Sequence, residues 1–376
     1  MLSRRIKYLL ILILIMLVAS SIRKNAIGRS LNFTRSSKTL LSLKLLAYQP
    51  TQNYAILRLN TAKRYFSSSA NPAESGSLVQ YKVSVAFQPK DRENLENKFV
   101  KSKKQKYAEA HKLYQGEEEG LSETGEDNYF VSIKDDSHLA MGVADGVGGW
   151  SELGFDSSAI SRELCQAMSR LYAGNQMLTP KQLLSLAYQE IQQSSKVEIG
   201  GTTACLGTVN PEGLLKVANL GDSWCGVFRN YKCIEQTEFQ THGFNTPFQL
   251  AKIPDEFLKK AQRQGKKYIM DTPKSADEYE FQLQSGDFVM FATDGVTDNI
   301  DVSDMEIFLK DHAEKLLHKN EQEMHQVTSK FVTEVVKLSK DVNYPSVFAQ
   351  ELSRLSGQKY LGGKEDDITV LLVKVQ

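Results

Sequence analysis

The first 66 residues of the chain lack acidic side chains altogether. Met1 to Phe66 carries twelve Lys and Arg and no Asp or Glu, and it is rich in Ser and Thr. This composition is typical of a mitochondrial transit peptide. We therefore expect a targeting leader over residues 1–66 and import into the mitochondrion, most simply into the matrix. Arg64-Tyr65-Phe66 before Ser67 resembles the processing sites of matrix-targeted precursors, so cleavage is expected after Phe66.

The leader also lacks a hydrophobic run long enough for an ordinary membrane span. Tyr8 to Ile22 holds fifteen residues without a charge, whereas a spanning helix needs about 20 apolar residues. Such a run suits a signal-peptide core, a signal anchor or an apolar presequence helix. A membrane-anchored form through residues 8–22 is therefore the alternative to matrix import, and contact with a membrane is expected only if this segment is retained.

Beyond the leader, basic side chains are too few to balance the acids. The whole chain has 46 Lys and Arg against 45 Asp and Glu, so without the twelve leader cations 34 basic residues face 45 acidic ones. This acidic balance argues against nucleic acid as a partner and is compatible with cation binding.

Cysteine is scarce, and its spacing excludes several classes of site. The four cysteines, Cys165, Cys205, Cys225 and Cys233, form no C-x-x-C pair and lie in apolar surroundings. Neither a disulfide framework nor a zinc site is expected from such spacing. No cysteine lies in a phosphate-binding loop that would activate a thiolate nucleophile.

Residues 67–78 are small and polar, as in a linker, and residues 79–376 alternate between short strands and amphipathic helices. Strands in runs followed by helices in runs favour an α+β fold of antiparallel sheets covered by helices over a doubly wound parallel sheet. The charged segment from Lys90 to Glu123 is expected to be solvated surface helix and loop. Strands are expected at 81–87, 125–133, 138–145, 202–209, 214–220, 223–228, 231–235, 287–293 and 367–375, and helices at 157–173 (capped by Ser157 or Ser158), at 179–193 and twice within 303–339.

Acidic side chains stand at the ends of these strands. A single one would be an ordinary turn residue, but several at equivalent strand ends would converge at one edge of a β-sandwich, where they repel one another unless protonated or neutralised by cations. Mg²⁺ and Mn²⁺ prefer such oxygen ligands, and two ions about 4 Å apart would activate a bridging water for attack on phosphorus. The acids are Glu126, Asp127, Asp145, Asp222, Asp294, Asp298, Asp366 and Asp367.

Glycines accompany the acid in the segment "GVADGVGGW". A glycine after Asp145 leaves room for the carbonyl oxygen of Gly146 to reach an ion, and Gly148 and Gly149 leave room for a substrate. A tight turn is the simpler interpretation, because Asp-Gly is a common turn dipeptide.

Six motifs occur in the order and spacing of one enzyme family: "GEDNYF", "GVADGVGGW", "GGTTACLGTV", "VANLGDSWCGVF", "MFATDGVTDNI" and "GGKEDDITVLLV". From about Val79 onward the chain resembles the metal-dependent protein phosphatase family of type 2C (PPM), and within it the mitochondrial branch. The resemblance implies a central β-sandwich of two antiparallel sheets flanked by helix pairs, with a binuclear Mn²⁺ or Mg²⁺ centre at one end.

The resemblance also implies which residues hold the two ions. Asp145 would bridge both of them. Glu126 and the carbonyl oxygen of Gly146 would complete the protein ligands of one ion, and Asp294 and Asp366 would hold the other.

The same resemblance implies supporting roles for further residues. Asp127 would orient water at the centre. Asp222 and Asp298 stand where some members bind a weaker third ion, and Asp367 stands where the family commonly has Asn, so it is expected to support the site. The mechanism implied is direct in-line attack by a bridging hydroxide, with no phosphoenzyme.

Two positions depart from the family pattern. Ser122 stands where many members have an Arg that grips the substrate phosphate, and Arg162 is the candidate replacement, with a helix-surface ion pair as the plainer interpretation. Val147 stands where many members have a His suited to protonating the leaving oxygen. His242 is the candidate there, and an exposed loop histidine without a role is the plainer interpretation.

The sequence thus indicates a protein serine/threonine phosphatase acting on phosphoproteins, with mitochondrial metabolic enzymes, including those of coenzyme Q synthesis, as the substrates that the resemblance suggests. Three alternatives are open: a pseudophosphatase that binds phosphoproteins, a hydrolase of small phosphate esters, and a membrane-anchored interaction protein.

Overall fold

The computed structural model describes residues 80–90, 122–135, 138–174, 177–317 and 321–376. The expected leader with its apolar segment, the linker and most of the charged segment lie outside the described residues, so the domain boundaries drawn there stay predictions. Among the described helices, none combines the length and the apolar character that a membrane span requires.

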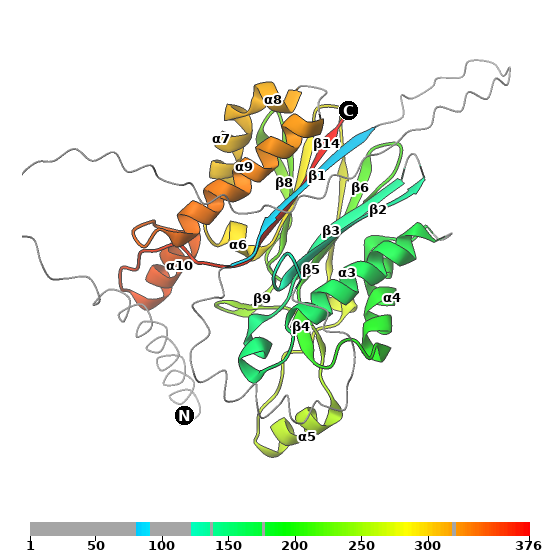
Figure 1. The fold of residues 1–376 in the computed structure, drawn as a ribbon, viewed down its shortest axis with the longest axis vertical. Helices are drawn as coiled ribbons and strands as arrows, with labels where there is room; N and C mark the ends of the chain where they lie inside the picture. Colours follow the sequence, from blue (N-terminus) through cyan, green and yellow to red (C-terminus); the bar gives the residue numbers. More distant parts are fainter. Residues whose placement is uncertain (1–79, 91–121, 136–137, 175–176, 318–320) are drawn as a thin grey trace, which may run out of the picture. The chain divides into compact units, whose positions relative to one another are not determined.

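Two five-stranded antiparallel sheets form the centre of the described chain (Figure 1). The first sheet contains, in spatial order, β1 (Tyr81–Gln88), β14 (Ile368–Val375), β13 (Phe288–Ala292), β7 (Trp224–Arg229) and β8 (Lys232–Gln236). The second contains β12 (Asp277–Gln282), β6 (Leu214–Leu220), β5 (Ala204–Val209), β3 (His138–Asp145) and β2 (Asp127–Asp135).

Apolar side chains alternate along the strands, which lets each sheet bury both faces. In β14, Leu371 and Val373 belong to the core between the two sheets, whereas Val370 and Leu372 belong to the core under the helices of the first sheet. The result is four layers, helix, sheet, sheet and helix, held by three apolar cores.

Helices cover the outer faces of both sheets (Figure 1). The second sheet carries α3 (Ser158–Ala173) and α4 (Pro180–Gln193), and the first carries α7 (Val302–Asp311), α8 (Ala313–Leu317) and α9 (Glu321–Lys340). The region 303–339 therefore holds three helices instead of the predicted two, because the chain turns at His312, the C-terminal cap of α7.

The two helices on the second sheet begin differently. Thr179 caps α4 through a full capping box with Gln182, as the sequence suggests. Ser157 precedes α3, but its hydroxyl makes no capping hydrogen bond. Ser157 thus occupies the N-cap position as predicted. Asp156 accepts the hydrogen bond from the backbone N–H of Ser158, so the hydroxyl of Ser157 is available for another partner.

Smaller elements complete the described chain. Trp150 in the helical turn after β3 packs with Ile199, Ala251 and Ile253 in a fourth apolar cluster, against which Tyr268 also lies. The elements are η3 (Gly148–Leu153), β4 (Gly200–Thr202), β9 (Thr241–Gly243), β10 (Thr246–Pro247), β11 (Leu250–Lys252), α5 (Asp255–Arg263), η4 (Pro273–Ser275), α6 (Asp294–Thr297) and α10 (Val347–Ser356).

Candidate metal centre

Acidic residues from both sheets meet at one edge of the sandwich. In the second sheet, Asp127 opens β2 and Asp145 closes β3, and the antiparallel register pairs these two residues directly. In the first sheet, Asp294 follows β13 and Asp366 precedes β14. Because β13 and β14 are antiparallel neighbours, the end of one lies beside the start of the other.

The carboxylate of Asp145 lies within the electrostatic reach of acids from both sheets. Burial raises the pKa of Asp145 well above its ordinary value, and neighbouring negative charges raise it further. These charges belong to Asp294, Asp127, Asp366 and Asp222. The acids that sequence analysis groups into one site are therefore brought together, although they are far apart along the chain.

The same crowding acts on the other acids of the edge. Burial, followed by the charge of Asp367, raises the pKa of Asp127. Burial also raises the pKa of Asp222 well above its ordinary value and that of Asp298 to about 7. Such a cluster needs protons or cations to be stable at neutral pH.

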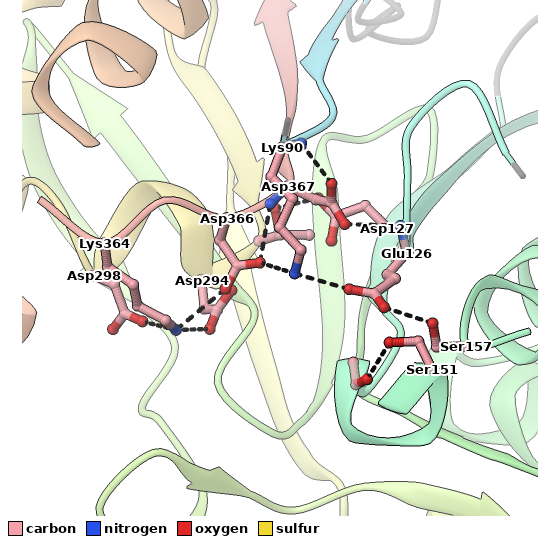
Figure 2. Close-up of polar contacts among 12 residues, drawn as sticks. Lys90, Glu126, Asp127, Ser151, Ser157, Asp294, Asp298, Lys364, Asp366 and Asp367 are labelled. Atoms are coloured by element: carbon pink, nitrogen blue, oxygen red, sulfur yellow. Dashed lines mark hydrogen bonds and ion pairs between the residues drawn. The ribbon is translucent and has the colours of Figure 1, made fainter. Parts of the chain in front are cut away.

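Two lysine ammonium groups supply part of that positive charge (Figure 2). The Nζ atom of Lys90 lies 2.8 Å from Glu126 Oε2 and 2.8 Å from Asp366 Oδ1. On the other side of Asp366, Lys364 bridges three acids. Its Nζ atom lies 2.7 Å from Asp294 Oδ2 and 3.4 Å from Asp366 Oδ2, and it also contacts Asp298 Oδ2.

The lysines decide the protonation state of the acid between them. Burial alone would raise the pKa of Asp366, but the ammonium groups of Lys364 and Lys90 lower it below its ordinary value. The position of Lys90 also corrects the sequence analysis, which treated it as the first residue of a solvated charged segment. No local pattern marks Lys90, because its place depends on β1 pairing with β14.

The backbone at Gly146 packs closely against the backbone of Ser157 and Glu126. Its N–H donates to the carbonyl oxygen of Glu126 over 3.0 Å. A Cβ atom at this position would lie 2.4 Å from the carbonyl oxygen of Ser157 and 2.7 Å from that of Glu126. Only glycine fits between these two backbone atoms. The glycine after Asp145 therefore allows the ends of β2, β3 and α3 to lie close together.

Buried hydrogen bonds hold the acids in place. Asp367 accepts from the backbone N–H groups of Glu126 and Lys90, each over 2.8 Å. The hydroxyl of Thr293 donates to Asp127 Oδ2 over 2.7 Å, and that of Ser157 donates to Glu126 Oε1 over 2.5 Å. Asp367 therefore acts through the backbone of its neighbours, and Ser157 is a site residue that sequence analysis assigned to helix capping.

Comparison with known proteins shows which family the chain belongs to. Residues 135–376 match the family model described as stage II sporulation protein E (SpoIIE). Over 311 residues, the chain is 51% identical to the mitochondrial protein phosphatase 2C homolog 7 of Saccharomyces cerevisiae, covering 81% of the chain and 84% of that protein. The chain belongs to the protein phosphatase 2C family.

Other members of this family agree with the assignment. Over 255 residues, the chain is 37% identical to protein phosphatase PTC7 homolog fig of Drosophila willistoni, covering 67% of the chain and 77% of that protein. The solved structure of the photosystem II phosphatase PBCP matches with a TM-score of 0.56 at 23% identity, over 79% of the chain and 99% of that structure. The predicted fold class is confirmed, and the chain is a protein serine/threonine phosphatase of type 2C.

Two residues proposed to replace missing family residues are engaged elsewhere. The guanidinium group of Arg162 donates to Ser158 Oγ over 3.1 Å and pairs with Asp156 over 3.4 Å. His242 Nε2 lies 2.9 Å from Asp271 Oδ2, and its ring stacks on Phe248. The contacts of Arg162 agree with the plainer interpretation of a helix-surface ion pair. His242 is exposed as expected, but it lies in strand β9 and not in a loop.

The donor atoms at the edge suit hard divalent cations. All the side-chain donors are carboxylate oxygens, and buried Asp127 Oδ1 and Asp222 Oδ1 have no hydrogen-bond partner among the described residues. Within the same residues, no three acidic, histidine or cysteine side chains are arranged to hold a metal ion as they stand. The ammonium groups of Lys90 and Lys364 lie between these acids, so cation binding requires them to move.

Ser157 offers a test of the support around Glu126. We expect Ser157→Ala to weaken Mn²⁺ binding about tenfold or more, because the hydroxyl no longer orients the carboxylate. Calorimetric titration of the EDTA-treated full chain with MnCl₂ measures the affinity. Ser151→Ala is the control, since that exposed hydroxyl donates to the carbonyl of Gly148. Equal affinity in the Ser157 variant and the wild type would contradict the assigned role.

Proposed function

We propose that the chain removes phosphate from phosphoserine and phosphothreonine of mitochondrial proteins, at a centre of two Mn²⁺ or Mg²⁺ ions. The ligands would be Glu126, Asp145, Asp294, Asp366 and the carbonyl oxygen of Gly146. The observation that supports this most directly is the position of Asp145, whose carboxylate lies close enough to acids of both sheets to interact with their charges. In a protein phosphatase 2C, such a cluster of carboxylates can hold the divalent cations that assist phosphate hydrolysis.

The two cations would lower the pKa of bound water and withdraw electron density from the phosphoryl group. The residues of the chain orient that chemistry. Asp145, at the end of β3, would hold the ions together with the other ligands. Asp127, whose Oδ2 accepts from Thr293 and whose Oδ1 has no hydrogen-bond partner among the described residues, would orient water at the centre. Asp222 and Asp298 would hold a weaker third ion.

The basic, acid-free composition of residues 1–66 and the name of the yeast relative support the cellular assignment. We infer that residues 1–66 direct import into the mitochondrial matrix. We also infer that the substrates are metabolic enzymes, including enzymes of coenzyme Q synthesis. Mass spectrometry of the mature N-terminus tests the import step. A start near Ser67 would remove residues 8–22, whereas retention of Met1 would favour the membrane-anchored form.

Metal removal tests the centre itself. The full chain treated with EDTA is expected to lose phosphatase activity on a phosphothreonine peptide, and MnCl₂ or MgCl₂ should restore it. The same additions should raise the melting temperature, because cations bind the folded state and relieve repulsion among the buried acids. Activity that survives EDTA, or a melting temperature that ignores both metals, would refute the proposed centre.

A parallel assay on phosphopeptides and on small phosphate esters separates the alternatives. The proposed function predicts higher kcat/KM on the peptides. A preference for small esters would instead favour the ester hydrolase. Metal and phosphopeptide binding without turnover would favour the pseudophosphatase.

A further inference from the structure

Lys90 joins the two sides of the acidic edge through one flexible side chain (Figure 2). Glu126 lies just before β2 of the second sheet, and Asp366 lies just before β14 of the first. The ammonium group of Lys90 is 2.8 Å from each of these carboxylates. It therefore neutralises one carboxylate from each of the two proposed ligand sets.

The backbone of Lys90 is fixed independently of its side chain. β1 pairs with β14 without interruption up to Gln88 opposite Ile368. Beyond that pair, the N–H of Lys90 donates to Asp367 Oδ1 over 2.8 Å. The Cα atom is therefore held at the rim of the centre, while the four-carbon stem leaves Nζ free to move by several ångströms.

Lys364 makes more contacts than Lys90. Its ammonium group contacts three acids and lies over the ring of Phe348, 5.3 Å from the centroid. Its backbone N–H donates to Asn299 Oδ1 over 2.9 Å. Lys90 contacts two carboxylates, and its side chain is 22% exposed against 17% for Lys364. Of these two cations, Lys90 therefore has fewer contacts to break before it can turn toward a bound substrate.

A phosphoryl group brings a double negative charge that benefits from a cation beyond the metal ligands. Ser122, at the position where many family members have an Arg, cannot supply this cation. It is neutral, and its hydroxyl bonds to Thr124 and Asn128. Arg162 is paired with Asp156. A divalent cation and an ammonium group repel each other, so they cannot share Glu126 and Asp366.

We propose that Lys90 is an exchangeable counter-ion: it neutralises Glu126 and Asp366 in the metal-free protein and binds the phosphoryl oxygens of the substrate once Mn²⁺ or Mg²⁺ takes those carboxylates. This inference rests on the proposed metal centre. Metal binding then prepares the phosphate site, because it releases the cation that the phosphate needs. Metal and phosphate must consequently strengthen each other's binding.

Calorimetry of the full chain tests this coupling without relying on turnover. Inorganic phosphate is titrated into EDTA-treated and Mn²⁺-loaded protein, for the wild type, Lys90→Gln and Lys90→Arg. We expect the Mn²⁺-loaded wild type to bind phosphate at least about tenfold more tightly than the Gln variant. The Arg variant should stay within about threefold of the wild type, and the metal-free wild type should bind phosphate weakly.

The metal affinity gives the second readout. The Gln variant is expected to bind Mn²⁺ as tightly as the wild type or more tightly, because a competing cation is gone. In kinetics on a phosphothreonine peptide, its KM should rise at least about tenfold. Lys266→Gln, which changes an exposed lysine just after α5, is the matched control and should behave as the wild type.

Each outcome has a distinct meaning. Unchanged phosphate affinity in the Gln variant overturns the role of Lys90, and so does weaker Mn²⁺ binding, which would make Lys90 a support of the metal ligands. Wild-type protein that binds Mn²⁺ and phosphate without phosphatase activity overturns the proposed function alone. Wild-type protein that binds no Mn²⁺ overturns both proposals.

Discussion

The Asp145→Asn variant is expected to lose phosphatase activity by a factor of about 100 or more while it keeps its fold. The amide removes the charge that would attract both cations. Several kcal/mol of transition-state stabilisation are lost with them, at about 1.4 kcal/mol for each tenfold change in rate. The two side chains have nearly the same size, so the packing at the end of β3 is preserved.

The same variant should be more stable than the wild type when metal is absent. Because burial and neighbouring acids raise the pKa of Asp145, its negative charge opposes folding at neutral pH, and the neutral amide removes that cost. Thermal unfolding in EDTA measures the difference. Asp255→Asn changes an exposed acid in the first turn of α5 and should alter neither property. A variant of Asp145 that retains most of its rate would refute the metal assignment.

The Gly146→Ala variant is expected to lose both stability and activity. The new Cβ atom would meet backbone oxygens of Ser157 and Glu126, and backbone atoms cannot rotate away as a side chain can. Overpacking of this kind costs about 1–3 kcal/mol. The strand end that carries Glu126 must also shift, and a displacement of about 1 Å at a reacting site lowers rates about a hundredfold.

Gly149→Ala is the matched control for that steric argument. A Cβ atom at Gly149 would meet nothing within 4 Å, so its free energy of unfolding should stay within about 0.5 kcal/mol of the wild type. Denaturant unfolding compares the two variants. Similar losses in both would mean that glycine is needed at Gly146 for chain flexibility, and the steric explanation would fail.

The strands and the acids that end them could be predicted from the sequence, because both depend on local patterns. Alternating apolar residues mark a strand wherever it pairs, and an Asp-Gly step marks where it stops. The strands predicted at 138–145 and 287–293 are examples. The order of strands and helices favours antiparallel sheets covered by helices, whereas the arrangement as a sandwich of two sheets is implied by the family resemblance. The convergence of the acids at one edge followed from the antiparallel arrangement of successive strands.

Contacts that depend on distant pairing could not be predicted. Lys90 reaches Asp366 because β1 lies beside β14, and nothing near Lys90 in the sequence encodes that neighbour. Ser157 illustrates a different limit. A serine before a helix is usually a cap, but here Asp156 takes that role and the serine hydroxyl bonds to Glu126 across the fold.

The position of β14 inside the first sheet has a consequence for transcripts with a premature stop codon. β14 lies between β1 and β13, and the few residues before it carry Lys364, Asp366 and Asp367. A premature stop codon upstream of this segment would remove the hydrogen-bonded neighbour of β1 together with two acids and one cation of the centre. We expect such truncated products to be substrates for quality-control proteases and not partly active enzymes.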